Sequence, residues 1–138
     1  MANYNSCART NYFRVTDEEK YKRLFEGLTA EDRVEDFTET RDGVIWHGFG
    51  SYSCIFWTSG EEDEECTRDD FYTQLQEILP EDEAFIYLEN GYEKLRYLTG
   101  FAEIVTKHDI RYVSVDDMAL AEARNMLGNP DFTTQLEY

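Results

Sequence analysis

Apolar residues recur at helical spacing in three parts of the chain, residues 16–26, 67–79 and 114–127. Each part begins with a hydroxyl residue that is followed three positions later by an acid, the signature of a helix N-terminus. The three pairs are Thr16 with Glu19, Thr67 with Asp70, and Ser114 with Asp117. Residues that end helices follow each part, namely Gly27, Pro80 and Gly128. The pattern therefore predicts three helices.

Strand-like runs lie between and around these helices. They cover residues 11–15, 34–40, 44–48, 51–57, 84–89, 94–106, 111–113 and 132–136. The turn signals Arg41-Asp42-Gly43 and Asn90-Gly91 predict two hairpins, and Gly100 predicts a bulge or break. The resulting order, β-α-β-β-β-α-β-β-β-α-β, predicts a single α+β domain over residues 1–138 with an antiparallel sheet of meanders and hairpins.

The composition supports a packed core. The chain has 138 residues, of which 41% are hydrophobic and 15% aromatic, so it can bury a core without a metal or disulfide. Most Tyr and Phe residues in the predicted strands are expected in that core, with some at exposed edges that suit a protein interface.

Charge is the most unusual feature of the sequence. The chain has 30 acids and 13 bases, a net charge of −17, which excludes a basic nucleic-acid-binding module and a surface that docks on anionic membranes. Residues 61–89 hold twelve acids and one base, Arg68, for a net charge of −11. We therefore distinguish an acidic loop-helix segment, residues 58–83, within the single domain.

The sequence predicts a cytoplasmic protein. No apolar run approaches the ~18–20 residues of a membrane span, and the first residues lack the apolar core of a signal peptide. The three cysteines, Cys7, Cys54 and Cys66, are odd in number and widely spaced, which favours free thiols in a reducing compartment. A disulfide between subunits through Cys7 or Cys66 is the alternative.

The residues do not predict an enzyme. Scattered Cys and His residues match no zinc spacing, Glu61–Glu65 lacks the pattern of a calcium loop, and no glycine-rich phosphate loop is present. We expect no metal site and no cofactor. Cys54 and His47 form a candidate nucleophile and base, but both lie among aromatic strand residues, which favours packing and a hydrogen-bonded imidazole.

The acidic segment allows two interpretations. It is a solvated face that keeps the protein soluble, or it imitates a nucleic-acid backbone, which carries one negative charge per ~1.7 Å of duplex and is bound by basic clefts. The second interpretation predicts a partner-binding site made of ten residues, Glu61, Glu62, Asp63, Glu64, Glu65, Asp69, Asp70, Glu81, Asp82 and Glu83.

A family resemblance bears on this choice. The blocks Asn3-Tyr4, 8–15 (ARTNYFRV), 93–100 (EKLRYLTG), 114–117 (SVDD) and the final Glu137-Tyr138 resemble a family of small acidic proteins of phages, plasmids and integrated elements. These blocks hold 24 of the 138 residues and are spread from one end of the chain to the other. The resemblance implies a counter-defence role such as that of anti-CRISPR and antirestriction proteins, many of which are similar to DNA in charge.

Two functional hypotheses follow. The first is an inhibitor in a bacterial host cell that binds a nucleic-acid-handling defence enzyme, above all a CRISPR effector, and blocks its DNA-binding site, with DNA mimicry as one means. The alternative is an accessory protein of a mobile element that binds a host protein through an aromatic sheet face.

Self-association is a separate question. Residues 16–26 carry a mixed-charge strip that would meet the acidic 61–83 segment of a second copy in a homodimer. The net charge of −17 opposes that approach, so a monomer is favoured.

Overall fold

The computed structural model describes residues 4–60 and 67–136. Its elements, in chain order, are β1 (Asn5–Thr10), α1 (Glu18–Glu26), β2 (Leu28–Ala30), β3 (Glu35–Asp36), β4 (Glu39–Arg41), β5 (Val44–Trp46), β6 (Phe49–Ser51), β7 (Ile55–Trp57), α2 (Arg68–Gln76), β8 (Ala84–Glu93), β9 (Tyr97–Thr106), β10 (Ile110–Ser114) and α3 (Val115–Leu127). The predicted α+β class, with three helices and antiparallel strands in a single domain, is confirmed.

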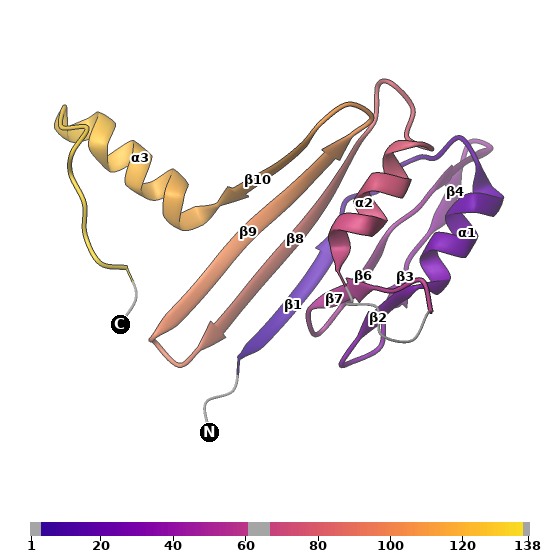
Figure 1. Cartoon of the computed structure of the whole chain (residues 1–138), viewed down its shortest axis with the longest axis horizontal. Helices are drawn as coiled ribbons and strands as arrows, with labels where there is room; N and C mark the ends of the chain where they lie inside the picture. The colour runs from indigo at the N-terminus through magenta and orange to yellow at the C-terminus, as the bar shows by residue number, and fades with distance from the viewer. Residues whose placement is uncertain (1–3, 61–66, 137–138) are drawn as a thin grey trace.

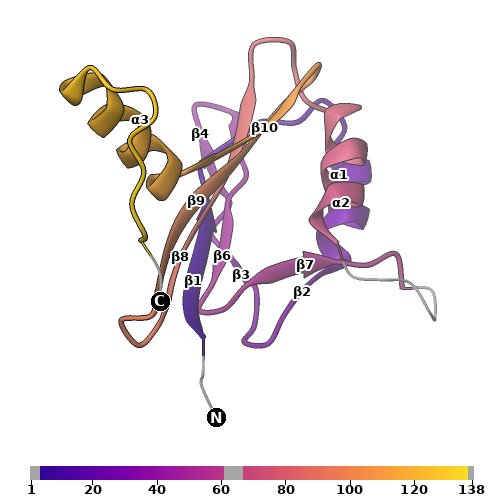
Figure 2. The same cartoon turned by 60° about the vertical axis from the view of Figure 1, so that its left-hand side comes forward.

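The main sheet has six strands in the order β10-β9-β8-β1-β6-β3, all antiparallel to their neighbours. Two smaller ribbons, β2–β7 and β4–β5, extend from it. Helices α1 and α2 lie side by side over one face of the main sheet, which we call the inner face (Figure 1). Figure 2 shows that α3 leaves the sheet on the other side, which we call the outer face.

Aromatic rings form the core between the inner face and the two helices. Phe85 of β8 is fully buried and its ring centroid lies 5.0 Å from that of Phe13 and 5.9 Å from that of Phe71 in α2. Phe49 of β6 contacts both Phe71 and Phe85. Edge-to-face pairs of this kind add stability beyond the area they bury. The aromatic residues therefore attach α2 to two neighbouring parts of the sheet.

The predicted hairpin at Asn90-Gly91 is wrong. Both residues lie within β8, where Asn90 pairs with Cys7 of β1 on one side and Gly100 of β9 on the other. A strand paired on both sides has no room for a turn. Glycine is needed at position 91 because an added Cβ would lie 2.2 Å from the Tyr4 hydroxyl oxygen.

The β8–β9 turn instead falls between Glu93 and Tyr97, and Lys94 adopts a left-handed φ of 52° there. The bulge expected at Gly100 is absent, because the ladder continues through this residue. The Gly100 Cα faces Val115, whose Cγ2 would lie 3.0 Å from an added Cβ. Gly100 thus allows α3 to start close to the sheet.

The turn at Arg41-Asp42-Gly43 is confirmed. Arg41 of β4 pairs with Val44 of β5 across Asp42 and Gly43, whose φ angles are 52° and 78°. Two consecutive left-handed residues are typical of a tight hairpin turn. The strands are shorter than the runs expected at 34–40 and 44–48.

Other boundaries also differ from the predictions. The first strand is Asn5–Thr10 rather than 11–15, where Phe13 forms only a single bridge with His47. The run 51–57 is divided between β6 and β7. Residues 132–136 form no strand.

Helix ends follow the sequence signals in part. Ser114 caps α3 by accepting a hydrogen bond from the Asp117 amide at 3.2 Å, and Gly128 ends it in the left-handed conformation. Asp17 rather than Thr16 caps α1, and the Thr16 hydroxyl donates to the Ile78 carbonyl instead. Helix α2 ends at Gln76, before the expected position, although Ile78 and Leu79 remain buried.

We expect Phe85→Ala to destabilise the fold by about 3–5 kcal/mol, because it removes the ring that joins β8 to α2 and leaves a cavity. Urea unfolding followed by circular dichroism measures the change. Leu95→Ala is the control, since this side chain is 75% exposed, and its effect should stay within about 0.5 kcal/mol. Equal effects of the two substitutions would contradict a core centred on Phe85.

Candidate functional site

The acidic 61–66 segment joins two anchored stretches of chain. The Thr67 amide donates to the Trp57 carbonyl at 3.0 Å, and the Thr58 amide donates to the Gly27 carbonyl at 3.0 Å. Both ends of the segment are therefore attached beside β7. The predicted contact residues Glu61–Glu65 lie outside the described residues.

Asp69 and Asp70 lie together in the first turn of α2, and both are exposed. Thr67 caps this helix: its hydroxyl oxygen accepts a hydrogen bond from the Asp69 amide at 3.0 Å. Acids are favoured at this position because the helix dipole places positive charge at the N-terminus. Within residues 4–60 and 67–136, neither carboxylate has an ion-pair partner.

Glu81, Asp82 and Glu83 lie beyond the other end of α2, and each contacts a base. Arg14 lies 3.2 Å from the Asp82 carboxylate and 2.8 Å from that of Glu83. His108 Nε2 lies 2.8 Å from the Glu81 carboxylate. These side chains therefore attach the α2–β8 connection to Arg14 and to the β9–β10 turn.

The described candidate residues thus form two groups at opposite ends of α2. The nine residues of the helix rise about 14 Å between them. Among the described residues Asp69 and Asp70 have no ion-pair partner, whereas Arg14 offsets part of the charge of the other group and His108 contacts Glu81. Their contact role stays a prediction for both groups.

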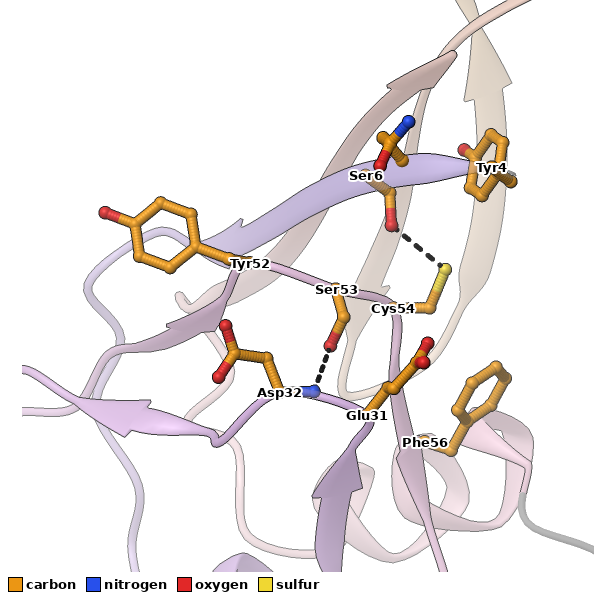
Figure 3. A pocket seen from close by; sticks show the side chains of 9 residues that line it. Tyr4, Ser6, Glu31, Asp32, Tyr52, Ser53, Cys54 and Phe56 are labelled. Atoms are coloured by element: carbon orange, nitrogen blue, oxygen red, sulfur yellow. Dashed lines mark hydrogen bonds between the residues drawn. The ribbon is translucent and has the colours of Figure 1, made fainter. Parts of the chain in front are cut away.

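A hollow of about 810 Å³ opens next to β7 (Figure 3). Its wall includes Glu31 and Asp32 from the β2–β3 connection, Tyr52 and Cys54 from the β6–β7 connection, and Phe56. Both acids are exposed, and no base is among the lining residues. The hollow is therefore suited to a cationic group.

Sequence reasoning missed Glu31 and Asp32. They precede Arg33 in a stretch without unusual charge, and no spacing marks them. The Asp32 amide donates to the Ser53 hydroxyl at 3.0 Å, a contact across 21 residues that fixes the connection at the hollow (Figure 3). Only the β2–β7 pairing brings the two segments together.

Four of the described acids that have no ion-pair partner lie near β7 and the first turn of α2. Phe56 lines the hollow, and its ring centroid lies 5.7 Å from the guanidinium carbon of Arg68, the first residue of α2. The first turn of α2 lies near β7 in Figure 2. We call Glu31, Asp32, Asp69 and Asp70 the acidic end.

A buried carboxylate lies behind the hollow. Glu89 of β8 is 5% exposed and accepts a hydrogen bond from the Tyr87 hydroxyl at 2.7 Å. The Cys54 thiol donates a hydrogen bond to the same carboxylate at 3.4 Å, and the Tyr4 hydroxyl donates another at 3.5 Å. Three donors on one carboxylate offset the cost of burying it.

Arg68 extends this polar network toward α2. Its Nε donates to Glu103 at 2.6 Å and its Nη1 to the Ile55 carbonyl at 2.8 Å. The guanidinium lies 4.4 Å from the ring centroid of Tyr87. Arg68 is thus a structural residue, and the one base within the acidic segment does not offset the charge of Asp69 or Asp70.

Cys54 and His47 have separate surroundings. Burial raises the pKa of the Cys54 thiol, and the nearby Glu89 carboxylate raises it further. His47 is 6% exposed, its Nε2 lies 2.7 Å from Glu18, and its ring stacks on Tyr21. A thiol with a raised pKa is a poor nucleophile at neutral pH, and the imidazole is hydrogen-bonded as expected.

Within the described part of the chain, no three His, Cys, Asp or Glu side chains are arranged to hold a metal ion. None of the helices described is both long and apolar enough to cross a membrane. No protein-family model, curated protein or solved structure matches the chain. The resemblance to small acidic proteins of mobile elements therefore stays a prediction.

We expect Glu89→Gln to destabilise the protein by about 1–3 kcal/mol, because the new amide places donor hydrogens against buried donors. Thermal and urea unfolding measure the change. Glu31→Gln makes the same change at an exposed position and should have an effect within about 0.5 kcal/mol. A neutral Glu89→Gln would show that the carboxylate is not the acceptor for the three side chains.

We expect iodoacetamide to alkylate Cys54 more slowly than the exposed Cys7 at a pH of about 8. The thiolate is the reactive form of cysteine. Because the pKa of Cys54 is raised, its alkylation rate should increase only at a higher pH than that of an ordinary thiol. The Cys66→Ser protein has only these two cysteines, and mass spectrometry measures how much of each is alkylated over time. Faster reaction at Cys54 would contradict its burial beside Glu89.

Proposed function

We propose that this protein is a counter-defence inhibitor of the bacterial cytoplasm. It binds a nucleic-acid-handling defence enzyme through the acidic end and blocks the DNA-binding site of that enzyme. An RNA-guided CRISPR nuclease is the first candidate partner. The protein acts by binding and not by catalysis.

The observation that carries this proposal is the unequal pairing of the acids. At one end of α2, Arg14 and His108 contact Glu81, Asp82 and Glu83. At the other end, Asp69 and Asp70 have no ion-pair partner among the described residues. The charges of Asp69 and Asp70 are therefore available to a basic partner.

Charge of this kind favours a basic cleft as the binding site. Enzymes that bind DNA neutralise phosphates with Lys and Arg side chains, and a rigid acidic surface enters the same field. Such complementarity speeds association and selects the partner more than it raises affinity. The five acids of residues 61–65 add to this field at the level of sequence.

The hollow supplies a second point of contact. Glu31 and Asp32 line it together with four residues that carry hydroxyl groups, Tyr4, Ser6, Tyr52 and Ser53. Carboxylates and hydroxyls accept hydrogen bonds from an ammonium or guanidinium group. A Lys or Arg side chain from the rim of a DNA-binding cleft is the group that suits this wall.

The test is DNA cleavage by a panel of purified RNA-guided nucleases in the presence of the protein. We expect the wild-type chain to inhibit at least one of them, and prebound target DNA to prevent binding. Asp69→Asn/Asp70→Asn should weaken inhibition about tenfold, because two charges leave the interface. The difference in inhibition between this variant and the wild type should become smaller as the salt concentration rises, because salt screens the charge contact of the wild type.

Glu81→Gln/Asp82→Asn is the matched control, since it removes two exposed charges at the other end of α2. It should leave inhibition unchanged. If the two double variants lose the same amount of inhibition, the effect comes from the net charge of the protein and not from the acidic end. Absence of inhibition across the panel would reject CRISPR nucleases as the partner.

A further inference from the structure

Helix α3 makes few contacts with the rest of the described chain: it touches β9 and β10, and Arg124 Nε donates to the Phe132 carbonyl at 2.8 Å. None of its 13 residues is buried. Val115, Met118, Met126 and Leu127 are 60–85% exposed. A helix of this length is marginal alone in water, and a helix in a folded protein normally buries its apolar side.

The outer face of the sheet is apolar and uncovered. Leu88 and Tyr92 of β8 and Leu98 of β9 are 45%, 52% and 60% exposed. Tyr92 lies opposite Leu98, and Leu88 lies opposite Ala102, so these side chains share one face. Helices α1 and α2 cover the other face (Figure 2).

Helix α3 does not cover this outer face itself. It follows Ser114 of β10 without a linker, and its first residue, Val115, contacts Gly100. From that point the helix leads away from the sheet (Figure 1). One chain therefore offers a largely exposed apolar helix and an apolar sheet face with exposed Leu88, Tyr92 and Leu98.

The charges of the two surfaces are complementary. Helix α3 carries three acids and one base. On the outer face, Arg9 of β1 lies beside Leu88, and within residues 4–60 and 67–136 it contacts no carboxylate. The neighbouring Glu35 is already paired with Arg33 at 3.2 Å.

The strands and helix at this edge of the sheet contribute little to the repulsion between two copies. Residues 97–127, from β9 to the end of α3, carry five acids and three bases, whereas the whole chain has a net charge of −17. The repulsion that favours a monomer therefore originates mainly elsewhere.

A hollow of about 360 Å³ on the outer face offers a place for an apolar side chain. Arg9, Phe37, Tyr52 and Leu88 line it. Helix α3 is about 20 Å long, enough to cross β9, β8 and β1 at their spacing of ~4.8 Å. Its last turn, with Met126 and Leu127, would then reach this hollow.

We propose that two copies of the chain form a two-fold dimer by exchanging α3. The helix of each copy lies across the outer face of the other, and Glu122 is the acid of α3 that approaches Arg9. Such a reciprocal contact covers both α3 helices and both outer faces at once. It leaves no such surface free to bind a third copy. The acidic end lies on the helix-covered side of the sheet, so both copies keep it free.

The test is sedimentation velocity of the full chain at low and high salt. We expect a dimer that persists at high salt, because apolar contacts dominate it. Leu88→Asp and Leu127→Asp should each raise the dissociation constant at least tenfold. Val44→Asp is the matched control, since Val44 of β5 is 41% exposed, close to the 45% of Leu88, and it should leave the dimer intact.

Mixing the two variants tests the exchange directly. Leu88→Asp retains a normal α3 and Leu127→Asp retains a normal outer face, so one of the two contacts survives in a mixed dimer. We expect the mixture to associate more strongly than either variant alone. Circular dichroism and melting temperature confirm that each variant is folded.

Three results would overturn the proposal. They are a monomeric wild-type chain at its highest soluble concentration, a dimer that neither substitution weakens, and a mixture no more associated than its components. A wild-type dimer that dissociates as salt is added would also overturn it and would assign the contact to charged surfaces. Nuclease inhibition by the monomeric variants is measured separately, so the proposed function and the dimer fail independently.

Discussion

The packing of Phe49 and Phe85 against Phe71 is the interaction on which the rest of the structure depends. Two of these rings come from strands of the main sheet and one comes from α2. They attach α2 to the inner face, and α2 in turn carries Asp69 and Asp70 at one end and leads to Glu81–Glu83 at the other. Without this aromatic contact the acids would have no fixed geometry.

The same packing divides the charged residues into structural and exposed groups. Arg68 lies between α2 and the sheet, where its guanidinium contacts the Glu103 carboxylate and the Tyr87 ring. Its charge therefore stabilises the packing of α2 on the sheet. Arg14 and His108 hold the far end of α2. Asp69 and Asp70 therefore keep their charge without an ion-pair partner among the described residues, because the neighbouring base Arg68 contacts Glu103 instead.

The packing also accounts for the unequal faces of the sheet. Both amphipathic helices that precede β8 pack on the inner face, and the only later helix starts at the sheet edge and leads outward (Figures 1 and 2). The proposed binding through the acidic end and the proposed self-association through the outer face would therefore use opposite sides of one sheet. A dimer of this kind would present two acidic ends to a partner.

The sequence by itself determined the class of the fold, the three helices and their order among the strands, since caps and apolar spacing act over a few residues. It also located Asp69 and Asp70 beside the acidic run. Only the tertiary structure decided that Asn90-Gly91 is strand, because β1 pairs with it from more than 80 residues away. Only the tertiary structure showed that Arg14 contacts Asp82 and Glu83, and that Glu31 and Asp32 line a hollow with Cys54. Local signals specify which conformation a segment prefers, but strand pairing and burial decide which side chains meet and which charges remain without a partner.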